Sequence, residues 1–204
     1  MLKFAWLGPP VAELDGVQIH FETRKIAALL AYLSLNSRGC SREKLAALFW
    51  PEFDQTHAMA NLRRALGSLT RVLPSDSFET NRESVRWSEV ASVELDVLKF
   101  RELIQAVRAH AHESGQGDST PGVCSCQSCR EGLETACELN RGDFLDGLNL
   151  PDAPAFDEWQ YLTRAELNRE LAWALEHWAG ALVNQAVAAG RVRPGQPVAG
   201  SPAW

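Results

Sequence analysis

Hydrogen-bond donors recur at helical spacing between residues 57 and 71 of the sequence. At about 100° per residue, one helix face there carries His57, Asn61, Arg64, Ser68 and Arg71, and the stretch 61–72 contains no acidic residue. Arg and Asn side chains on a helix surface donate hydrogen bonds to phosphates and to the edges of bases. The pattern therefore predicts a surface on this helix that contacts DNA.

Two arginines further along the chain extend this predicted surface. Arg82 lies at the tip of an expected hairpin around residues 81–84, and Arg86 lies in its second strand. A hairpin beside such a helix can touch the neighbouring backbone or minor groove of the DNA. The predicted DNA contacts are Asn61, Arg63, Arg64, Ser68, Arg71, Arg82 and Arg86.

A second group of reactive side chains is the CxCxxC run formed by Cys124, Cys126 and Cys129. Together with Cys137 and the nearby pair His110 and His112, these thiols could supply four ligands to Zn²⁺. The run is too closely spaced for an ordinary disulfide framework, and it lacks the second spaced CxxC of a zinc ribbon. We therefore expect reduced thiols, with Cys137 buried, no cofactor and no metal; zinc on the three clustered thiols stays open as the alternative.

The sequence lacks the motifs of common enzymes. It contains no Gly-rich phosphate loop, no GxSxG and no HExxH, so we expect a protein that is not an enzyme.

No apolar run approaches the roughly 20 residues of a membrane span, and residues 1–3 lead into a short strand rather than a signal-peptide core. These features favour a cytoplasmic protein with no membrane partner.

Charge is distributed unevenly along the chain, whose formal net charge is −6. Residues 1–92 contain 11 Lys and Arg against 10 Asp and Glu, a balance of +1, whereas residues 93–204 contain 9 against 16, a balance of −7. The acidity therefore belongs to the second half, and it does not exclude phosphate binding by the first half.

Residues 1–92 are expected to form a small sheet, three helices and a hairpin. Strands at 3–8 and 11–14 precede Asp15-Gly16, a dipeptide typical of a tight hairpin turn. Thr23, Ser41 and Asp54 are suitable N-caps for helices that end near residues 36, 50 and 73. This order is typical of a winged helix, a helix-turn-helix with a β-hairpin wing, whose third helix enters the major groove.

Helical periodicity alone continues after residue 92. Helices are expected at about 97–111, 130–140 and 155–189, and the remaining residues are rich in Gly and Pro. We predict an α+β winged-helix DNA-binding domain at 1–92, an all-α tetratricopeptide-like domain at 93–189 and a disordered tail at 190–204. The spacing of Trp159, Trp173 and Trp178 suits helix packing and, in addition, a homodimer surface.

Several motifs of the chain resemble one family of regulators. The N-terminal motifs are TRK (23–25), ALLAYL (28–33), SRE (41–43), LAALFWP (45–51) and ANLRRAL (60–66). They resemble the winged-helix domain of activators of the Streptomyces antibiotic regulatory protein (SARP) type. Downstream, RGDFLDG (141–147) and FDEW (156–159) resemble the bacterial transcriptional activator domain that follows it. The resemblance spans about residues 3–185.

This resemblance implies a sequence-specific regulator, usually an activator, that binds double-stranded DNA at promoter repeats and contacts RNA polymerase. Residues 61–71 would form its recognition helix and residues 81–86 its wing. In the family the helical domain continues through further helix pairs, whereas here the periodicity ends near residue 189. We therefore expect an incomplete helical domain.

Two other functions stay open at this level. An Arg-bearing helix face can simply be solvated, and the chain would then be a helical protein-interaction adaptor that does not bind DNA. Alternatively, the thiols between residues 124 and 129 would make the chain a thiol- or metal-responsive regulator.

Overall fold

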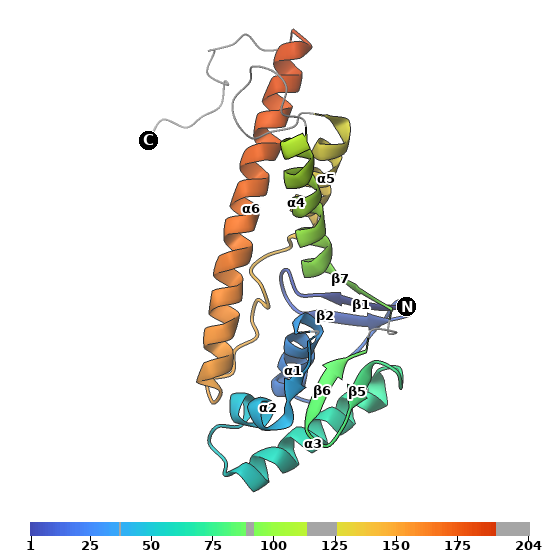
Figure 1. Ribbon diagram of the computed structural model, residues 1–204, viewed down its shortest axis with the longest axis vertical. Helices are drawn as coiled ribbons and strands as arrows, with labels where there is room; N and C mark the ends of the chain where they lie inside the picture. The colour runs from blue at the N-terminus through green and yellow to red at the C-terminus, as the bar shows by residue number, and fades with distance from the viewer. Residues whose placement is uncertain (37, 89–91, 114–125, 191–204) are drawn as a thin grey trace. The chain divides into compact units, whose positions relative to one another are not determined.

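The computed structural model describes residues 1–36, 38–88, 92–113 and 126–190 (Figure 1). The chain divides into two compact units. The first comprises Met1–Leu98 and Asn140–Leu167, and the second comprises Lys99–Leu139 and the chain from Asn168 onward. Helices α4 (Asp96–Glu113) and α6 (Pro154–Ala188) each contribute residues to both units.

The first unit opens with a four-stranded sheet in the order β3-β2-β1-β7. Its strands are β1 (Leu2–Ala5), β2 (Val11–Leu14), β3 (Val17–Gln18) and β7 (Val93–Leu95). The turn between β2 and β3 places Asp15 and Gly16 at positive φ, as the predicted hairpin requires. β7 pairs parallel with β1, whereas the other neighbours are antiparallel. This last strand was not predicted, because its partner lies about 90 residues away in sequence.

Three helices follow the hairpin, and each begins after its predicted cap. They are α1 (Arg24–Leu35), α2 (Arg42–Phe49) and α3 (Gln55–Val72). The side-chain oxygens of Thr23, Ser41 and Asp54 accept the N–H three residues on, at 3.3, 3.2 and 3.1 Å. α3 packs against both α1 and α2, so the helix-turn-helix pair predicted from the sequence is present.

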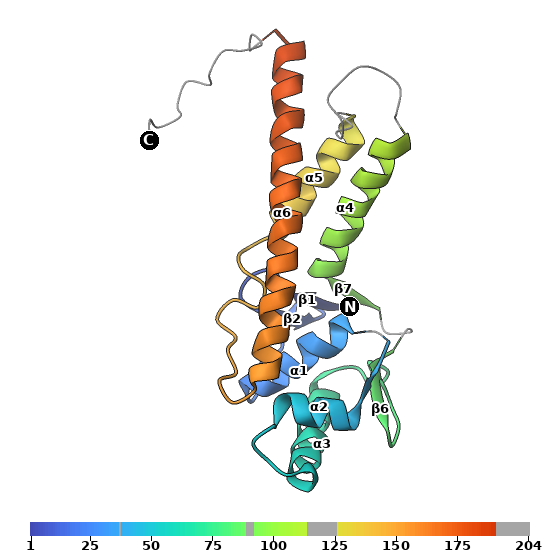
Figure 2. The ribbon, with the colours of Figure 1, turned by 60° about the vertical axis from the view of Figure 1, so that its left-hand side comes forward.

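A second, three-stranded sheet forms the hairpin of the winged helix. Its order is β4-β6-β5, with β4 (Cys40–Ser41), β5 (Phe78–Thr80) and β6 (Ser84–Trp87). β4 attaches the hairpin to the start of α2 through the pairs Cys40 with Val85 and Ser41 with Ser84. The hairpin and α3 lie at the same end of the first unit in the views of Figures 1 and 2.

Residues 140–167 complete the first unit, although they follow the helices α4 and α5 (Gln127–Leu139) in sequence. Leu145 N–H donates to the carbonyl of Trp6 at 2.8 Å, and Arg141 N–H donates to that of Leu7 at 2.9 Å. Gly8 has φ +129°, and a Cβ there would lie 3.0 Å from the Cβ of Arg141. Glycine at this position therefore permits the close approach of the two segments.

Aromatic packing reinforces the same association. Trp159 lies against Tyr32 and Phe144, with ring centroids 4.8 and 5.8 Å apart, and Phe156 lies 5.2 Å from Phe49. Since Tyr32 and Phe49 belong to α1 and α2, these contacts bury the start of α6 against the helices of the winged helix.

The predicted domain boundary lies between residues 92 and 93 and assigns residues 140–167 to the second domain. In the structure, these residues belong to the first compact unit.

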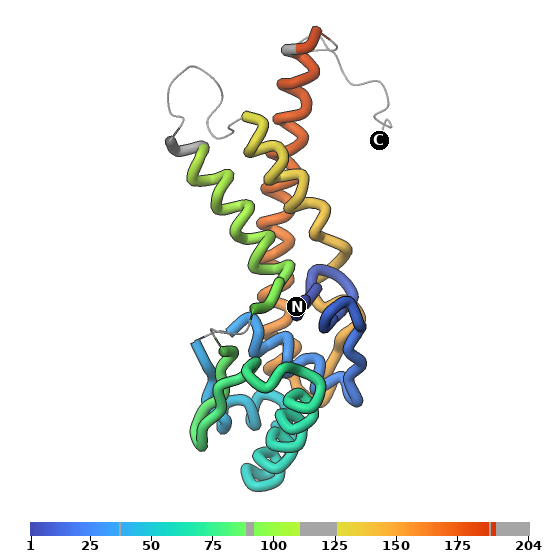
Figure 3. The backbone as a smooth tube through the Cα atoms, turned by 90° about the vertical axis from the view of Figure 1, so that its right-hand side faces the viewer, coloured from blue at the N-terminus to red at the C-terminus, as the bar shows by residue number. Residues whose placement is uncertain are grey.

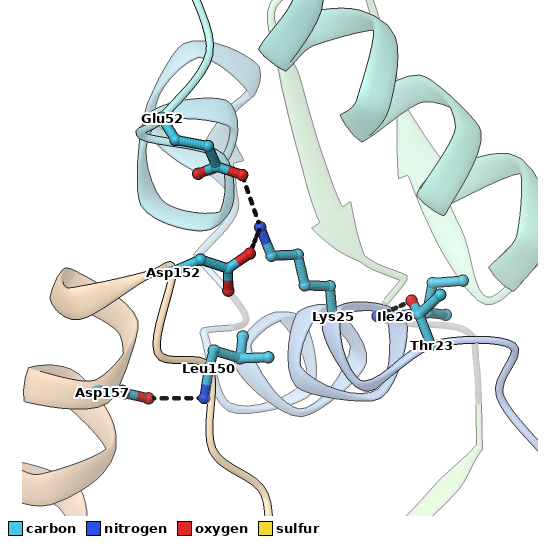
Figure 4. A network of polar contacts seen from close by, with 7 residues as sticks. All are labelled: Thr23, Lys25, Ile26, Glu52, Leu150, Asp152 and Asp157. Carbon is cyan, nitrogen blue, oxygen red and sulfur yellow. Dashed lines mark hydrogen bonds and ion pairs between the residues drawn. The ribbon is translucent and has the colours of Figure 1, made fainter.

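A lysine on α1 adds a polar contact to this packing (Figure 4). Lys25 Nζ lies 2.8 Å from Asp152 Oδ2 and 3.2 Å from Glu52 Oε1. The hydrogen bond and positive charge of Lys25 hold the pKa of Asp152 below its ordinary value. Lys25 thus joins α1 to the loop before α6 and to the loop before α3.

Asp96 makes a second polar junction, between the end of β1 and the start of α4. Its Oδ1 accepts the backbone N–H of Trp6 at 2.9 Å, and its Oδ2 accepts that of Leu7 at 2.8 Å. Burial raises the pKa of Asp96, and the backbone hydrogen bonds oppose this shift. The carboxylate therefore satisfies two N–H groups that the sheet leaves without a strand partner.

The second unit is entirely helical within the described chain. It contains most of α4, all of α5 (Gln127–Leu139) and the later part of α6. Figures 2 and 3 show α4 and α5 side by side, and a Cβ on Gly132 would lie 3.5 Å from Val107 Cγ2. The Arg108 guanidinium lies 4.4 Å from the ring centroid of Trp173, which ties α4 to α6.

The structure confirms the predicted fold class, an α+β winged helix followed by a helical region. All three helices predicted beyond residue 92 are present, with ends within about three residues of those expected. Among the described helices, none is both long and apolar enough to cross a membrane. The predicted tail at 190–204 lies, except for Gly190, outside the described residues.

Candidate nucleic-acid interface

α3 owes its orientation to an apolar stripe. Ala58, Leu62, Ala65 and Leu69 recur at intervals of three and four residues and are buried. At its N-terminus, backbone and side-chain hydrogen bonds from His57 lower the pKa of Asp54, the capping residue. The 18 residues of α3 include no Asp or Glu. The side of α3 that faces away from α1 and α2 is therefore without carboxylates of its own.

Arg63 and Arg64 are both exposed on this side. Arg64 Nη1 donates to Asn61 Oδ1 at 3.3 Å, which orients the guanidinium along the helix. Arg63 makes no hydrogen bond or ion pair with the residues that the structure describes. The structure thus brings three of the predicted contacts, Asn61, Arg63 and Arg64, together within about one turn of α3, with both guanidinium groups exposed.

Ser68 and Arg71 are placed differently from the expectation. Ser68 is only 8% exposed, and its hydroxyl donates to Glu22 Oε2 at 3.2 Å. Arg71 Nη2 donates to Ser68 Oγ at 2.9 Å and lies 3.9 Å from Glu22 Oε1. The loop before α1 covers this flank of α3 with a carboxylate, which the helical pattern of α3 alone does not reveal. Arg71 remains exposed, but its charge is shared with Glu22.

Two small residues occupy the middle of the outward side of α3. The helical repeat places Ala60 and Gly67 opposite the buried stripe, and both are half-buried between larger neighbours. A Cβ added to Gly67 would meet nothing within 4 Å, so packing within the protein does not require glycine there. Neither side chain carries a hydrogen-bond donor, so the donor pattern of the sequence does not mark these two positions.

Hydrogen bonds link the hairpin turn to itself and to the start of α2. Asn81 Oδ1 accepts the N–H groups of Glu83 and Ser84 at 2.8 and 2.7 Å, and Arg42 Nε donates to the Asn81 carbonyl at 2.8 Å. Arg82 stands exposed on this turn and makes no ion pair within the described part of the chain. The turn therefore presents one guanidinium from a fixed backbone.

Arg86, the other predicted contact of the hairpin, is paired within the protein. Its Nε donates to Glu79 Oε2 at 2.8 Å across the strand pair β5–β6. A phosphate would have to compete with this carboxylate for the guanidinium. Arg86 is therefore less available than Arg82, although it is exposed.

The predicted thiol cluster falls partly within the structure. Cys124 and the side chain of His112 lie outside the described residues, whereas Cys126 and Cys129 lie at the start of α5 beside His110. Cys137 is half-buried further along α5, and burial raises the pKa of its thiol. The sequence offers His110, His112 and Cys137 as further ligands beside the clustered thiols. Among the described residues, the one that lies beside Cys126 and Cys129 is His110.

Comparison with known proteins supports the fold. No family model matches the chain, and no curated protein matches it. Among solved structures, the chain is similar to Mycobacterium tuberculosis EmbR, a structure described as a complex with a low affinity phosphopeptide. The TM-score is 0.71 at 22% identity, and the match covers 93% of this chain. It covers 46% of the EmbR chain, so this chain spans about half the length of that protein.

Proposed function

We propose that this protein is a sequence-specific DNA-binding transcriptional regulator. The observation that carries the proposal is α3 itself, an 18-residue helix with exposed arginines and no carboxylate in a chain of net charge −6. It is the second helix of a helix-turn-helix pair, at the same end of the unit as a β-hairpin. Such a helix can enter the major groove while the hairpin touches the flanking backbone.

Arg63, Arg64 and Arg82 are the proposed primary contacts. They are exposed, and none forms an ion pair with a carboxylate within the described chain. Asn61 assists by orienting Arg64. Arg71 and Arg86 are proposed as secondary contacts, because each guanidinium already lies beside a carboxylate of the protein, Glu22 and Glu79 respectively. Ser68 is proposed to influence DNA binding only through its hydrogen bond with Arg71.

The resemblance to SARP-type activators makes the proposal more specific. The motifs at 23–66 and 141–159 carry this resemblance, and the fold they imply is similar to that of EmbR. By this analogy the chain binds promoter repeats, activates transcription and contacts RNA polymerase.

Homodimerisation is also proposed, because α6 exposes large apolar side chains. They are Tyr161, Leu162, Leu175, Leu182 and Val183.

Selection of bound fragments from random genomic DNA, followed by sequencing, tests the proposal. Wild type should enrich a repeated motif, and Arg63→Ala/Arg64→Ala should lose the enrichment. The matched control is Lys3→Ala/Lys99→Ala, which removes the same charge from exposed positions outside α3 and the hairpin. Failure of wild type to enrich any motif or to retain DNA at low salt would refute the proposal and favour the adaptor function.

A further inference from the structure

Three potential metal ligands meet in the second unit, apart from the proposed DNA-binding surface. His110 comes from α4, whereas Cys126 and Cys129 come from the start of α5. His110 Nδ1 lies 3.1 Å from Cys129 Sγ and 3.5 Å from Cys126 Sγ, and the three ligand atoms all lie within 4.8 Å of one another. Two segments separated by 16 residues thus direct one nitrogen and two sulfurs to a common point.

The spacing of these atoms suits a small tetrahedral ion. With Zn–S of about 2.3 Å and Zn–N of about 2.0 Å, tetrahedral ligands lie about 3.5–3.8 Å apart. The observed distances from nitrogen to sulfur, 3.1 and 3.5 Å, lie within a few tenths of an ångström of the expected spacing. The two sulfurs lie within 4.8 Å of each other and would close by up to about 1 Å around the ion. Among the described residues, no Asp or Glu joins the group, which disfavours Mg²⁺ and Ca²⁺ and favours Zn²⁺.

The start of α5 also places backbone N–H groups beside the cysteine sulfurs. Cys126 occupies the cap position, since its carbonyl accepts the N–H of Arg130 at 3.2 Å. The N–H of Cys129 points to Cys126 Sγ at 3.4 Å. N–H groups and the positive end of a helix stabilise a sulfur anion at this position. Cys129 is only 3% exposed, so its sulfur reaches the common point from the protein side.

We propose that His110, Cys126 and Cys129 bind one Zn²⁺ ion that links α4 to α5. The three side chains occupy three tetrahedral positions and leave one position for a further ligand. Because the ligands come from two helices, the binding free energy of the metal contributes to the folding of the second unit. The ion therefore acts as a structural link, and its loss loosens α5 from α4.

Cobalt substitution tests the site on the full chain, purified under reducing conditions and treated with chelator. Added Co²⁺ should give thiolate-to-cobalt charge-transfer absorption and the intense d–d bands of a tetrahedral site, at one equivalent per chain, and Zn²⁺ should displace it. His110→Asn and Cys126→Ser should weaken this binding by at least about tenfold, as loss of a ligand requires. Cys137→Ser, which removes a thiol of α5 outside the cluster, should bind as wild type does.

Two kinds of result would overturn the proposal. The first kind concerns cobalt binding: either the reduced wild-type protein shows no charge-transfer absorption, or His110→Asn binds cobalt as tightly as wild type. The second is a Cys126–Cys129 disulfide that persists in the reduced preparation, seen by mass spectrometry as the loss of two hydrogens. Since the readout is metal binding and not DNA binding, either result leaves the proposed function untouched.

Discussion

Gly67 offers a prediction in which stability and DNA affinity move in opposite directions. Glycine inside a helix costs about 0.5–1 kcal/mol relative to alanine, and a Cβ at Gly67 would meet nothing within 4 Å. Gly67→Ala should therefore stabilise the first unit by about 0.5–1 kcal/mol, which raises its melting midpoint by about 2–4 °C. If DNA lies against the middle of the outward side of α3, the added methyl group meets DNA atoms in the complex. An overpacked contact costs about 1 kcal/mol or more, which is roughly a fivefold loss of affinity.

The assay pairs differential scanning calorimetry with fluorescence anisotropy on the selected DNA. Gly180→Ala is the matched control, because Gly180 is also within a helix with open space around its Cβ but lies on α6. It should show a similar gain in stability and an unchanged DNA affinity. If Gly67→Ala binds DNA as tightly as wild type, α3 does not approach DNA along Ala60 and Gly67, and the proposed docking of the helix is wrong.

Three further predictions concern polar contacts of the first unit. Asp96→Ala should lower the free energy of unfolding by about 2–4 kcal/mol in urea titrations, because two backbone N–H groups at the end of β1 lose their acceptor; an unchanged midpoint would contradict this. Lys25 depresses the pKa of Asp152, so this pair stabilises the protein fully above the ordinary carboxyl value of 3.8. The stability advantage of wild type over Asp152→Asn should therefore shrink as pH falls below 3.8, and a difference independent of pH would refute the role of the pair. Glu22→Gln should strengthen DNA binding in anisotropy titrations, because it releases the charge of Arg71, and weaker binding would argue against that contact.

Local chemistry explains why the helices could be predicted from the sequence. Thr23, Ser41 and Asp54 form the caps that were expected, and the stripe of α3 is buried as its spacing predicts. These features depend on residues three or four positions apart, which a single sequence displays directly.

Contacts between distant segments explain what the sequence did not reveal. The pairing of β7 with β1 and the docking of residues 140–147 on residues 6–8 join parts of the chain about 90 and 135 residues apart, as their hydrogen bonds show. Glu22, in a loop 46 residues earlier in the chain, accepts a hydrogen bond from Ser68 and covers it. No local periodicity encodes such neighbours, and the choice of His110 as the partner of the thiols has the same origin.

The salt dependence of DNA affinity tests the central claim most directly. Each phosphate neutralised by an arginine releases counterions, so the slope of log K against log salt steepens by about 0.9 for each contact. Arg63→Ala/Arg64→Ala should bind the selected motif more weakly and with a slope reduced by about 2, whereas Lys3→Ala/Lys99→Ala should keep the wild-type slope. Equal slopes for wild type and the Arg63→Ala/Arg64→Ala variant would contradict the account, because α3 would then contribute no phosphate contacts.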